Sequence, residues 1–485
     1  MLMLPEIIIV ATAIAVLLID LVLSERRRIL LAPLTLAGIG AALLALILGV
    51  QMDGQILGGQ FAMDAAAWWF KIIFLISGFV TVILSMDLLD GRAAVRVRGL
   101  GFRGEYYALL LFTLSGMMYM VSARDLITLY VSLELAAIPL FSLVAWRRDH
   151  VQSGEAAMKY IVTGAMASAF TLYGLSLLYG LTGTMDLAGI ATLLQPSPVF
   201  WLAAGLVLTG VGFKLTLVPF HMWAADVYEG APTPVTAYLS VASKAAGLAF
   251  LFQIFFRTLG PTAGQWTFLM AILAAATMTL GNLVAIVQKN IKRFMAFSAI
   301  SQAGYLILGF VSPLVAGWPS GDGVPAMMFY MLVYVTTNLG VFTCIVWYSN
   351  QTGREDIDDY RGLSRTNPLM ALALMLALFS LAGIPPLSGF VGKFFLFKIA
   401  SGAGFHWLVA VAAVNSTISL YYYLGIVRRM YIEPPFDGAK SLPVSKKLGL
   451  TSLVLTLAVV LLGIIPFFYE TIHRYLSGWL AALGR

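Results

Sequence analysis

Lysine side chains stand inside long apolar stretches of this sequence, where they could bind and release protons. Lys214, Lys244 and Lys393 each lie well within a run of hydrophobic residues. A lysine at the centre of a bilayer costs about 2.5–3.5 kcal/mol, and helix packing alone needs no such residue. Glu134 is the one carboxylate that we expect deep in a run of this kind. Burial lowers the pKa of a lysine and a nearby carboxylate raises it again, so a lysine under both influences exchanges protons near neutral pH.

The alternative is that these residues form static ion pairs between helices. One deep acid cannot neutralise three deep lysines, which favours the proton-carrying interpretation. Lys159 is a candidate for a secondary role, although it lies about one helical turn after Glu155 and could instead pair with it at the surface. His221 follows a proline by two residues; it either bridges a chain of water molecules or caps a broken helix.

Two other lysines, Lys71 and Lys398, are nearer the ends of their apolar runs. We expect both side chains to extend to the membrane interface.

The elements that hold these residues must be membrane-spanning helices. Hydrophobic residues make up 60% of the 485 positions and charged residues only 11%, whereas soluble domains carry about 25% charged residues. Apolar runs of about 20 residues recur, and a helix of that length crosses a ~30 Å hydrocarbon core. We therefore expect an all-α polytopic membrane protein of about 14 spans, near residues 5–23, 32–50, 66–86, 105–121, 126–145, 157–180, 199–218, 234–256, 266–286, 294–310, 326–349, 368–400, 405–427 and 449–469.

The basic residues alternate along this series of spans. With the amino terminus outside, about twenty lysines and arginines fall in the inner loops and about four in the outer segments. The positive-inside rule then predicts that both termini lie on the outer side of the membrane. The net charge of +7 is thus explained by a membrane surface, and nucleic acid is not an expected partner. The single cysteine, Cys344, cannot hold an iron–sulfur cluster, and no metal site is expected.

Prolines interrupt two of the expected spans. Pro219 breaks the seventh near Lys214, and Pro385-Pro386 break the twelfth shortly before Lys393. Each broken span is the fourth helix of a block of five. Because each block has an odd number of spans, the second block begins on the opposite side of the membrane and is inverted relative to the first. Broken helices at matching places in inverted repeats are typical of carriers, although unrelated kinks would give the same prolines. The predicted organisation is residues 1–104 (three helices), 105–260 (helices 4–8), 261–432 (helices 9–13) and 433–485 (helix 14).

Several motifs then resemble one known family. The segment from His221 to Val235, running on through Ala242-Ser243-Lys244, resembles the signature of the antiporter-like membrane subunits of respiratory complex I. Asn290-Ile291-Lys292-Arg293 is similar to the tenth helix of that family, and Leu381 to Phe394 to its broken twelfth helix. Asn415-Ser416, with the tyrosines that follow as far as Tyr431, is similar to the N-type branch. The resemblance extends over essentially the whole chain.

This resemblance implies a proton-translocating subunit of NADH:quinone oxidoreductase. It places a coupled pair at Glu134 and Lys214, a central relay at Lys244 and a far relay at Lys393, whereas the M-type sister carries a glutamate at that last position. Gln302 occupies a position where many N-type relatives carry histidine, so only ordering of water is expected there.

The same resemblance implies the partners of the chain. NADH, FMN, iron–sulfur clusters and quinone are expected in other subunits, and no cofactor in this one. The neighbours would be the M-type subunit, small membrane subunits and membrane lipids in the plasma membrane of a prokaryote. The alternatives are a subunit of a multisubunit cation/proton antiporter or of a related membrane-bound hydrogenase.

Overall fold

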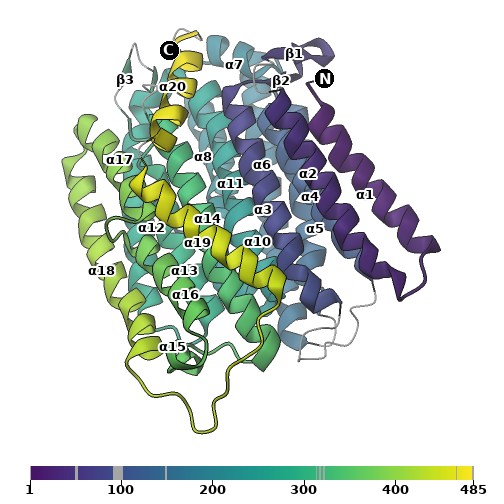
Figure 1. The fold of residues 1–485 in the computed structure, drawn as a ribbon. Helices are drawn as coiled ribbons and strands as arrows, with labels where there is room; N and C mark the ends of the chain where they lie inside the picture. The colour runs from purple at the N-terminus through teal and green to yellow at the C-terminus, as the bar shows by residue number, and fades with distance from the viewer. Residues whose placement is uncertain are drawn as a thin grey trace.

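Long helices run side by side through almost the whole of the computed structural model (Figure 1). The structure describes residues 2–49, 53–90, 102–147, 150–312, 314–315, 318–319, 323–465 and 467–482. Both termini lie at one end of the molecule, which we call the terminal end, and α15 lies at the opposite end, which we call the α15 end (Figure 1). Four arginines of the expected inner loops fall outside the described residues: Arg92, Arg96, Arg98 and Arg148.

The first part of the chain carries three long helices and a small hairpin. Strands β1 and β2 pair antiparallel with Gly54 opposite Met63. The elements are α1 (Leu4–Val22), η1 (Arg27–Leu30), α2 (Leu31–Leu48), β1 (Gly54–Ile56), η2 (Leu57–Gly59), β2 (Phe61–Met63) and α3 (Ala65–Leu89).

The middle part of the chain contains the first of the two broken spans. Its elements are α4 (Arg103–Ser122), α5 (Leu126–Val144), α6 (Val151–Thr182), α7 (Leu187–Leu193), α8 (Pro198–Leu215), α9 (Trp223–Gly230), α10 (Thr233–Tyr238), η3 (Leu239–Ser243), α11 (Lys244–Leu251), η4 (Phe252–Thr258) and η5 (Gly260–Thr262). The segments η3 and η4 are π-helical, so α10, η3, α11 and η4 form one continuous span with local changes of pitch.

The last part of the chain contains the second broken span and a two-stranded pair, β3 with β4. Its elements are α12 (Ala263–Ala285), α13 (Ile291–Ile307), β3 (Leu314–Val315), β4 (Trp318–Pro319), α14 (Gly323–Thr352), η6 (Ile357–Tyr360), α15 (Leu363–Thr366), α16 (Pro368–Ala382), α17 (Ser388–Gly402), α18 (His406–Tyr431), α19 (Lys446–Ile464) and α20 (Phe467–Ala482).

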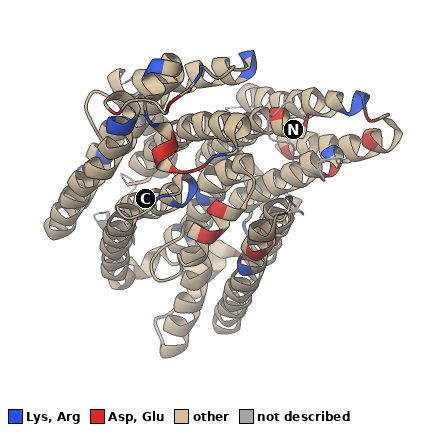
Figure 2. Cartoon of the chain, turned by 90° about the horizontal axis from the view of Figure 1, so that it is seen from below, with Lys and Arg blue, Asp and Glu red and all other residues tan. Residues whose placement is uncertain are grey.

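The membrane-spanning character is confirmed, although the number of spans is not. Among the described residues, eleven helices are long and apolar enough to cross a membrane. Three expected spans are absent from that set, and α4, α13 and the pair α16/α17 occupy their ranges. Lysine, arginine and the acids are sparse along the helices, which are mostly tan in a view from the α15 end (Figure 2).

Both expected helix breaks are present. Helix α8 ends at Leu215, and Thr216 follows it with φ of 60°. Helix α16 ends at Ala382, and Gly383 follows with φ of 89°. A left-handed residue cannot continue the helix, and the prolines that follow lack the N–H that would restart the ladder. The last carbonyl groups of α8 and α16 are consequently left without helical donors inside the span.

Helix α14 is the centre of the molecule. It is 30 residues long, and almost its whole length is enclosed by other helices. It packs against α3 and α10 on one side and against α16, α17 and α19 on the other. A helix in this position has no lipid-facing surface, so polar residues on it are shielded by protein rather than exposed to hydrocarbon.

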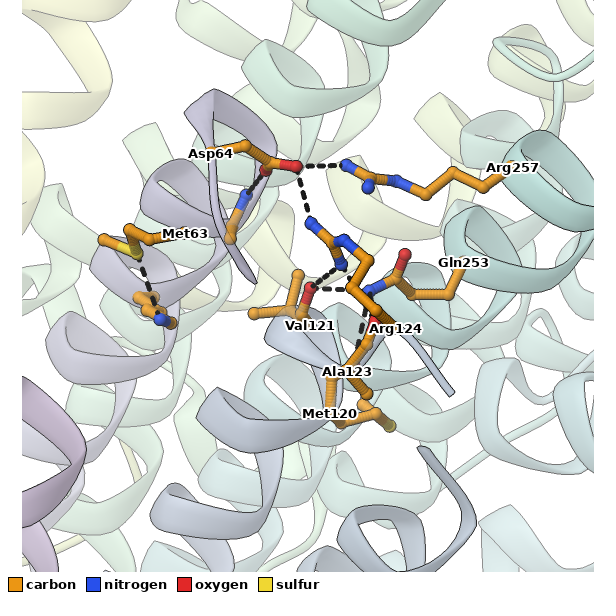
Figure 3. A network of polar contacts seen from close by, with 10 residues as sticks. Met63, Asp64, Met120, Val121, Ala123, Arg124, Gln253 and Arg257 are labelled. Carbon is orange, nitrogen blue, oxygen red and sulfur yellow. Dashed lines mark hydrogen bonds and ion pairs between the residues drawn. The ribbon is translucent and has the colours of Figure 1, made fainter. Parts of the chain in front are cut away.

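A buried carboxylate joins three segments at the terminal end. Asp64 caps α3 by accepting a hydrogen bond from Ala67, and its other oxygen lies 2.7 Å from Arg124 and 2.6 Å from Arg257 (Figure 3). Gln253 donates to the carbonyl groups of Val121 and Ala123 beside this pair. Burial by itself would raise the pKa of the Asp64 carboxyl group. The two arginines and the Ala67 amide together have a larger, opposite effect and bring this pKa down to about 2. These bonds tie α3 to the α4–α5 connection and to η4.

Candidate functional site

Glu134 lies on α5, half-buried against α6. The hydroxyl group of Ser168 donates to its Oε1, and Tyr130 is 3.0 Å from the same hydroxyl group. Gly116 lets α4 approach closely here, because a Cβ at that residue would lie 2.5 Å from the backbone nitrogen of Ala136. The carboxylate is thus held on a tightly packed part of α5, with neutral hydroxyl groups as its described neighbours.

Lys214 occupies the last turn of α8 and is buried. It has no hydrogen bond or ion pair to any of the residues that the structure describes, and Glu134 acts on it only electrostatically. A Cβ built on Gly247 would lie 3.0 Å from Lys214 Cβ. Lys214 therefore packs directly against α11, about one turn from Lys244.

Lys244 begins α11, immediately after the π-helical segment η3. Its ammonium nitrogen donates to the carbonyl oxygen of Leu215 at 3.2 Å and to the hydroxyl oxygen of Thr216 at 2.5 Å. These acceptors belong to the break after α8, where the carbonyl groups have lost their helical donors. The negative end of the α8 dipole also favours a cation here. The broken helix therefore supplies a binding site for the Lys244 side chain.

Lys393 has the same relationship with the second break. Its ammonium nitrogen donates to the carbonyl oxygens of Leu381 at 2.9 Å and Ala382 at 3.3 Å, and to the hydroxyl group of Ser416 at 3.3 Å. The Tyr305 ring lies 4.5 Å from it. Lys244 and Lys393 are therefore both buried and bonded to neutral oxygen atoms at the carboxyl end of a half-helix.

A row of polar side chains on α14 lies between the two breaks. We call Tyr330, Tyr334, Thr337 and Asn338 the α14 polar stripe; their spacing of three or four residues puts them on one side of the helix. Asn338 donates to the hydroxyl group of Ser240 at 2.7 Å, and Tyr334 donates to the Ser240 carbonyl oxygen at 2.9 Å. Ser240 precedes Lys244 by one helical turn. The first half of the stripe is thus anchored beside Lys244.

The other half of the stripe reaches the second break. Thr337 lies 3.2 Å from the hydroxyl group of Ser380, and Tyr330 donates to Oε1 of Gln302. Gln302 in turn donates to the carbonyl oxygen of Leu381 at 3.2 Å, the same oxygen that binds Lys393. Gln302 therefore belongs to the polar surroundings of Lys393 even though it cannot titrate.

The sequence did not single out the α14 polar stripe. Its signal would have been a set of tyrosine, threonine and asparagine residues at helical spacing within an otherwise apolar span. Such residues are common in membrane helices, where they also join helices, so the pattern alone is weak.

The two secondary candidates lie apart from this row. Lys159 is exposed and forms ion pairs with Glu155 at 2.7 Å and Asp226 at 2.6 Å. This is the surface pairing that the sequence left open. His221 lies in the segment between α8 and α9, and its Nδ1 has no hydrogen-bond partner among the described residues. No described contact connects either residue to Lys214.

Lys71 corrects a sequence-based expectation. We expected its side chain to extend to the interface, but it is fully buried and its nitrogen lies 2.6 Å from Glu6 Oε1. Glu6 is in the first turn of α1 and is also fully buried, whereas Glu134 lies near the middle of α5. Lys398 is exposed, and its extension to the interface stays a prediction. Lys292, which lies between the expected spans 266–286 and 294–310, is buried 2.9 Å from Glu355.

Comparison with known proteins decides the family. Residues 123–419 match the family model described as "NADH:quinone oxidoreductase/Mrp antiporter, TM". The chain is 40% identical over 482 residues to NADH-quinone oxidoreductase subunit N of Dehalococcoides mccartyi, covering 96% of each chain. It is 43% identical to the subunit N of Desulfovibrio desulfuricans, covering 95% of this chain and 92% of the relative. The chain belongs to the subunit N family of NADH-quinone oxidoreductases.

Solved structures agree with membership of the subunit N family. A chain of respiratory complex I from Thermus thermophilus with bound aureothin superposes with a TM-score of 0.80 at 32% identity, covering 96% of this chain and 97% of that one. A chain of the Mrp complex from Dietzia has a TM-score of 0.85 at 22% identity, covering 98% and 97%. The second likeness concerns the fold alone.

Proposed function

We propose that this chain conducts protons across the membrane as the N-type, antiporter-like subunit of a proton-pumping NADH:quinone oxidoreductase. It is one membrane subunit of a multisubunit complex. Electron transfer from NADH to quinone takes place in partner subunits, which hold the flavin, the iron–sulfur clusters and the quinone. Identity to subunit N relatives over about 95% of the chain favours this function over a cation/proton antiporter or a hydrogenase subunit.

One observation carries the proposal. Lys244 and Lys393 are buried, and all their described hydrogen-bond partners are neutral oxygen atoms. A lysine paired with a fixed carboxylate keeps its proton, because separating a buried ion pair leaves an uncompensated charge. Neutral oxygens accept hydrogen bonds from an ammonium group and, more weakly, from an amine. The two lysines can therefore gain and lose a proton without breaking an ion pair.

The path that we propose starts at Glu134 and Lys214, continues to Lys244 and ends at Lys393. Lys214 packs beside α11 near Lys244. The α14 polar stripe, together with Ser240, Gln302 and bound water, would carry the proton between the two breaks. Movement of Glu134 relative to Lys214 would start each transfer: at an effective dielectric of about 20, separating unit charges from ~4 to ~8 Å changes their interaction by about 2 kcal/mol. Lys159 and His221 have at most secondary roles.

Entry of protons would occur at the α15 end. A polar pocket of about 260 Å³ opens there, with Arg147, His150, Glu229, Lys292 and Glu355 among the residues that line it. The proposed orientation, with this end on the inner side of the membrane and both termini on the outer side, is the one that the loop charges favour.

The test uses the intact complex in sealed vesicles, with NADH oxidation and proton uptake measured together. Lys244→Met should lower coupled turnover and pumping by at least about tenfold, because the proton-accepting group is lost. Lys398→Met is the matched control, since that lysine is exposed; it should pump normally. Normal pumping by an assembled Lys244→Met complex would remove the lysine row from the proton route.

A further inference from the structure

A groove of about 750 Å³ lies at the α15 end, away from the proton path. It is bounded by the end of α12, the start of α13, the turn at η6 and the last turns of α18. Ile286, Tyr421, Leu424 and Ile432 form much of an apolar wall, and each is at least 40% exposed. Such a wall is suited to hydrocarbon rather than to water.

Basic side chains form the rim of this groove. Lys289 and Arg428 both line it and both are exposed. The acids nearby are already occupied: Asp358 lies 2.6 Å from Arg429, and Glu433 lies 3.0 Å from Arg361.

The balance of charge leaves the rim positive. Arg361, Arg428 and Arg429 share two carboxylates, so one positive charge remains, and Lys289 adds a second without an ion pair among the described residues. Asp356 also lines the groove; its side chain closes a capping box with the turn that it begins, and its carboxylate subtracts one charge, so the rim keeps an excess of one positive charge.

We propose that this groove binds one anionic phospholipid. Its phosphate group would lie between Lys289 and Arg428, and an acyl chain would follow the apolar wall along α18. Basic pockets between helices at the inner membrane surface suit anionic head groups. A free phosphate ion would leave the apolar wall uncovered, and a neutral lipid would leave the rim charges unmatched. Phospholipid binding in this groove does not depend on the proposed proton path.

Gly425 provides a way to close the groove without changing its charge. It lines the groove, and a Cβ built on it would meet only the guanidinium group of Arg429, at 3.7 Å. A leucine at this position would therefore extend into the groove. Lys440 and Lys446 are exposed lysines outside the groove at the same end of the molecule. Their replacement removes the same number of charges and serves as the control.

The experiment uses the intact complex, purified in detergent and depleted of lipid. It is incubated with phosphatidylglycerol or phosphatidylcholine that carries a photoreactive acyl chain, and labelling of residues 421–432 is measured by peptide mass spectrometry. Phosphatidylglycerol should label this segment several-fold more strongly. Each basic residue near the surface strengthens such binding about fivefold, so the double variant Lys289→Gln/Arg428→Gln should lower its labelling at least tenfold.

The controls separate a lipid site from its rivals. The Lys440→Gln/Lys446→Gln double variant should be labelled like the unaltered complex, and Gly425→Leu should lose labelling by both lipids. Equal labelling by the two lipids would show only a lipid-facing surface and overturn the proposal. Absence of labelling, with Ile432→Cys cross-linking to another subunit, would assign the groove to a protein neighbour. If the double glutamine variant fails to assemble, the lipid preference of the unaltered complex and Gly425→Leu still decide.

Discussion

The ammonium nitrogen of Lys244 lies 2.5 Å from the hydroxyl oxygen of Thr216, the left-handed residue at which α8 ends. The same nitrogen donates to the carbonyl oxygen of Leu215, which the break deprives of a helical donor. The lysine therefore replaces hydrogen bonds that α8 loses, and the broken helix in turn stabilises the lysine in the membrane interior. The Lys244 side chain and the irregular backbone after α8 therefore stabilise each other.

This relationship predicts the effect of removing the hydroxyl group alone. Thr216→Val keeps a β-branched residue at the same backbone conformation but removes one acceptor from the charged form of Lys244. Proton pumping in vesicles should fall several-fold while the complex assembles normally. Thr216→Ser restores the acceptor and should restore pumping. Equal pumping by the valine and serine variants would show that the hydroxyl group does not act on Lys244.

The α14 polar stripe predicts a second phenotype, at a residue that does not titrate. Asn338→Leu removes the donor to Ser240 and interrupts the row between the two breaks. Coupled pumping should fall by about tenfold or more. Thr343→Val is the control on the same helix, because among the described residues that hydroxyl group bonds only to Leu339, within its own helix. A leucine variant that assembles and pumps like the control would exclude the stripe from the route.

The identity of the charged group at residue 214 should matter as much as its charge. Lys214→Arg keeps a cation within reach of Glu134 but does not release its proton at any working pH. Pumping should be lost in Lys214→Arg as fully as in Lys214→Met, with NADH oxidation measured on the same vesicles. Recovery of pumping in the arginine variant would mean that residue 214 supplies only a positive charge.

The sequence predicted what depends on neighbouring residues and missed what depends on distant ones. The breaks were predicted correctly because Pro219 and Pro385-Pro386 act on their own helices. Lys71 was misinterpreted because its partner, Glu6, lies 65 positions earlier and no periodicity connects the two. The bonds of Lys244 to Leu215 and Thr216 were likewise not predictable, since they depend on how α11 packs against α8.

The buried pair between α1 and α3 predicts a strong stability effect. Lys71→Met leaves Glu6 buried and unpaired, which should cost about 3–5 kcal/mol. The double variant Glu6→Gln/Lys71→Met should regain most of this loss, because both charges are then absent. Thermal stability of the purified complex, with retention of this subunit, measures both. A double variant no more stable than the single one would show that the pair does not act as a unit.

Asp64 predicts a stability effect with a defined pH range. Its pKa of about 2 is below the usual value of 3.8, so its ionised form favours the folded state. That stabilisation is complete above about pH 5 and is lost only as the pH falls from about 4 to 2. Asp64→Asn should therefore lower thermal stability by about 2 kcal/mol or more, equally at every pH from 5 to 8. A loss that changes markedly within this range would indicate that another group is titrating.

The enclosure of α14 has a consequence for biosynthesis. When this helix leaves the ribosome, α16, α17 and α19, which cover one side of it, have not yet been made. Its tyrosines, threonine and asparagine then face lipid or the insertion machinery instead of their final partners. The row between the two breaks can close only after the last third of the chain has been inserted. A chain that ends soon after residue 352 would therefore hold its central helix without a complete protein environment, and its first half could not mature alone.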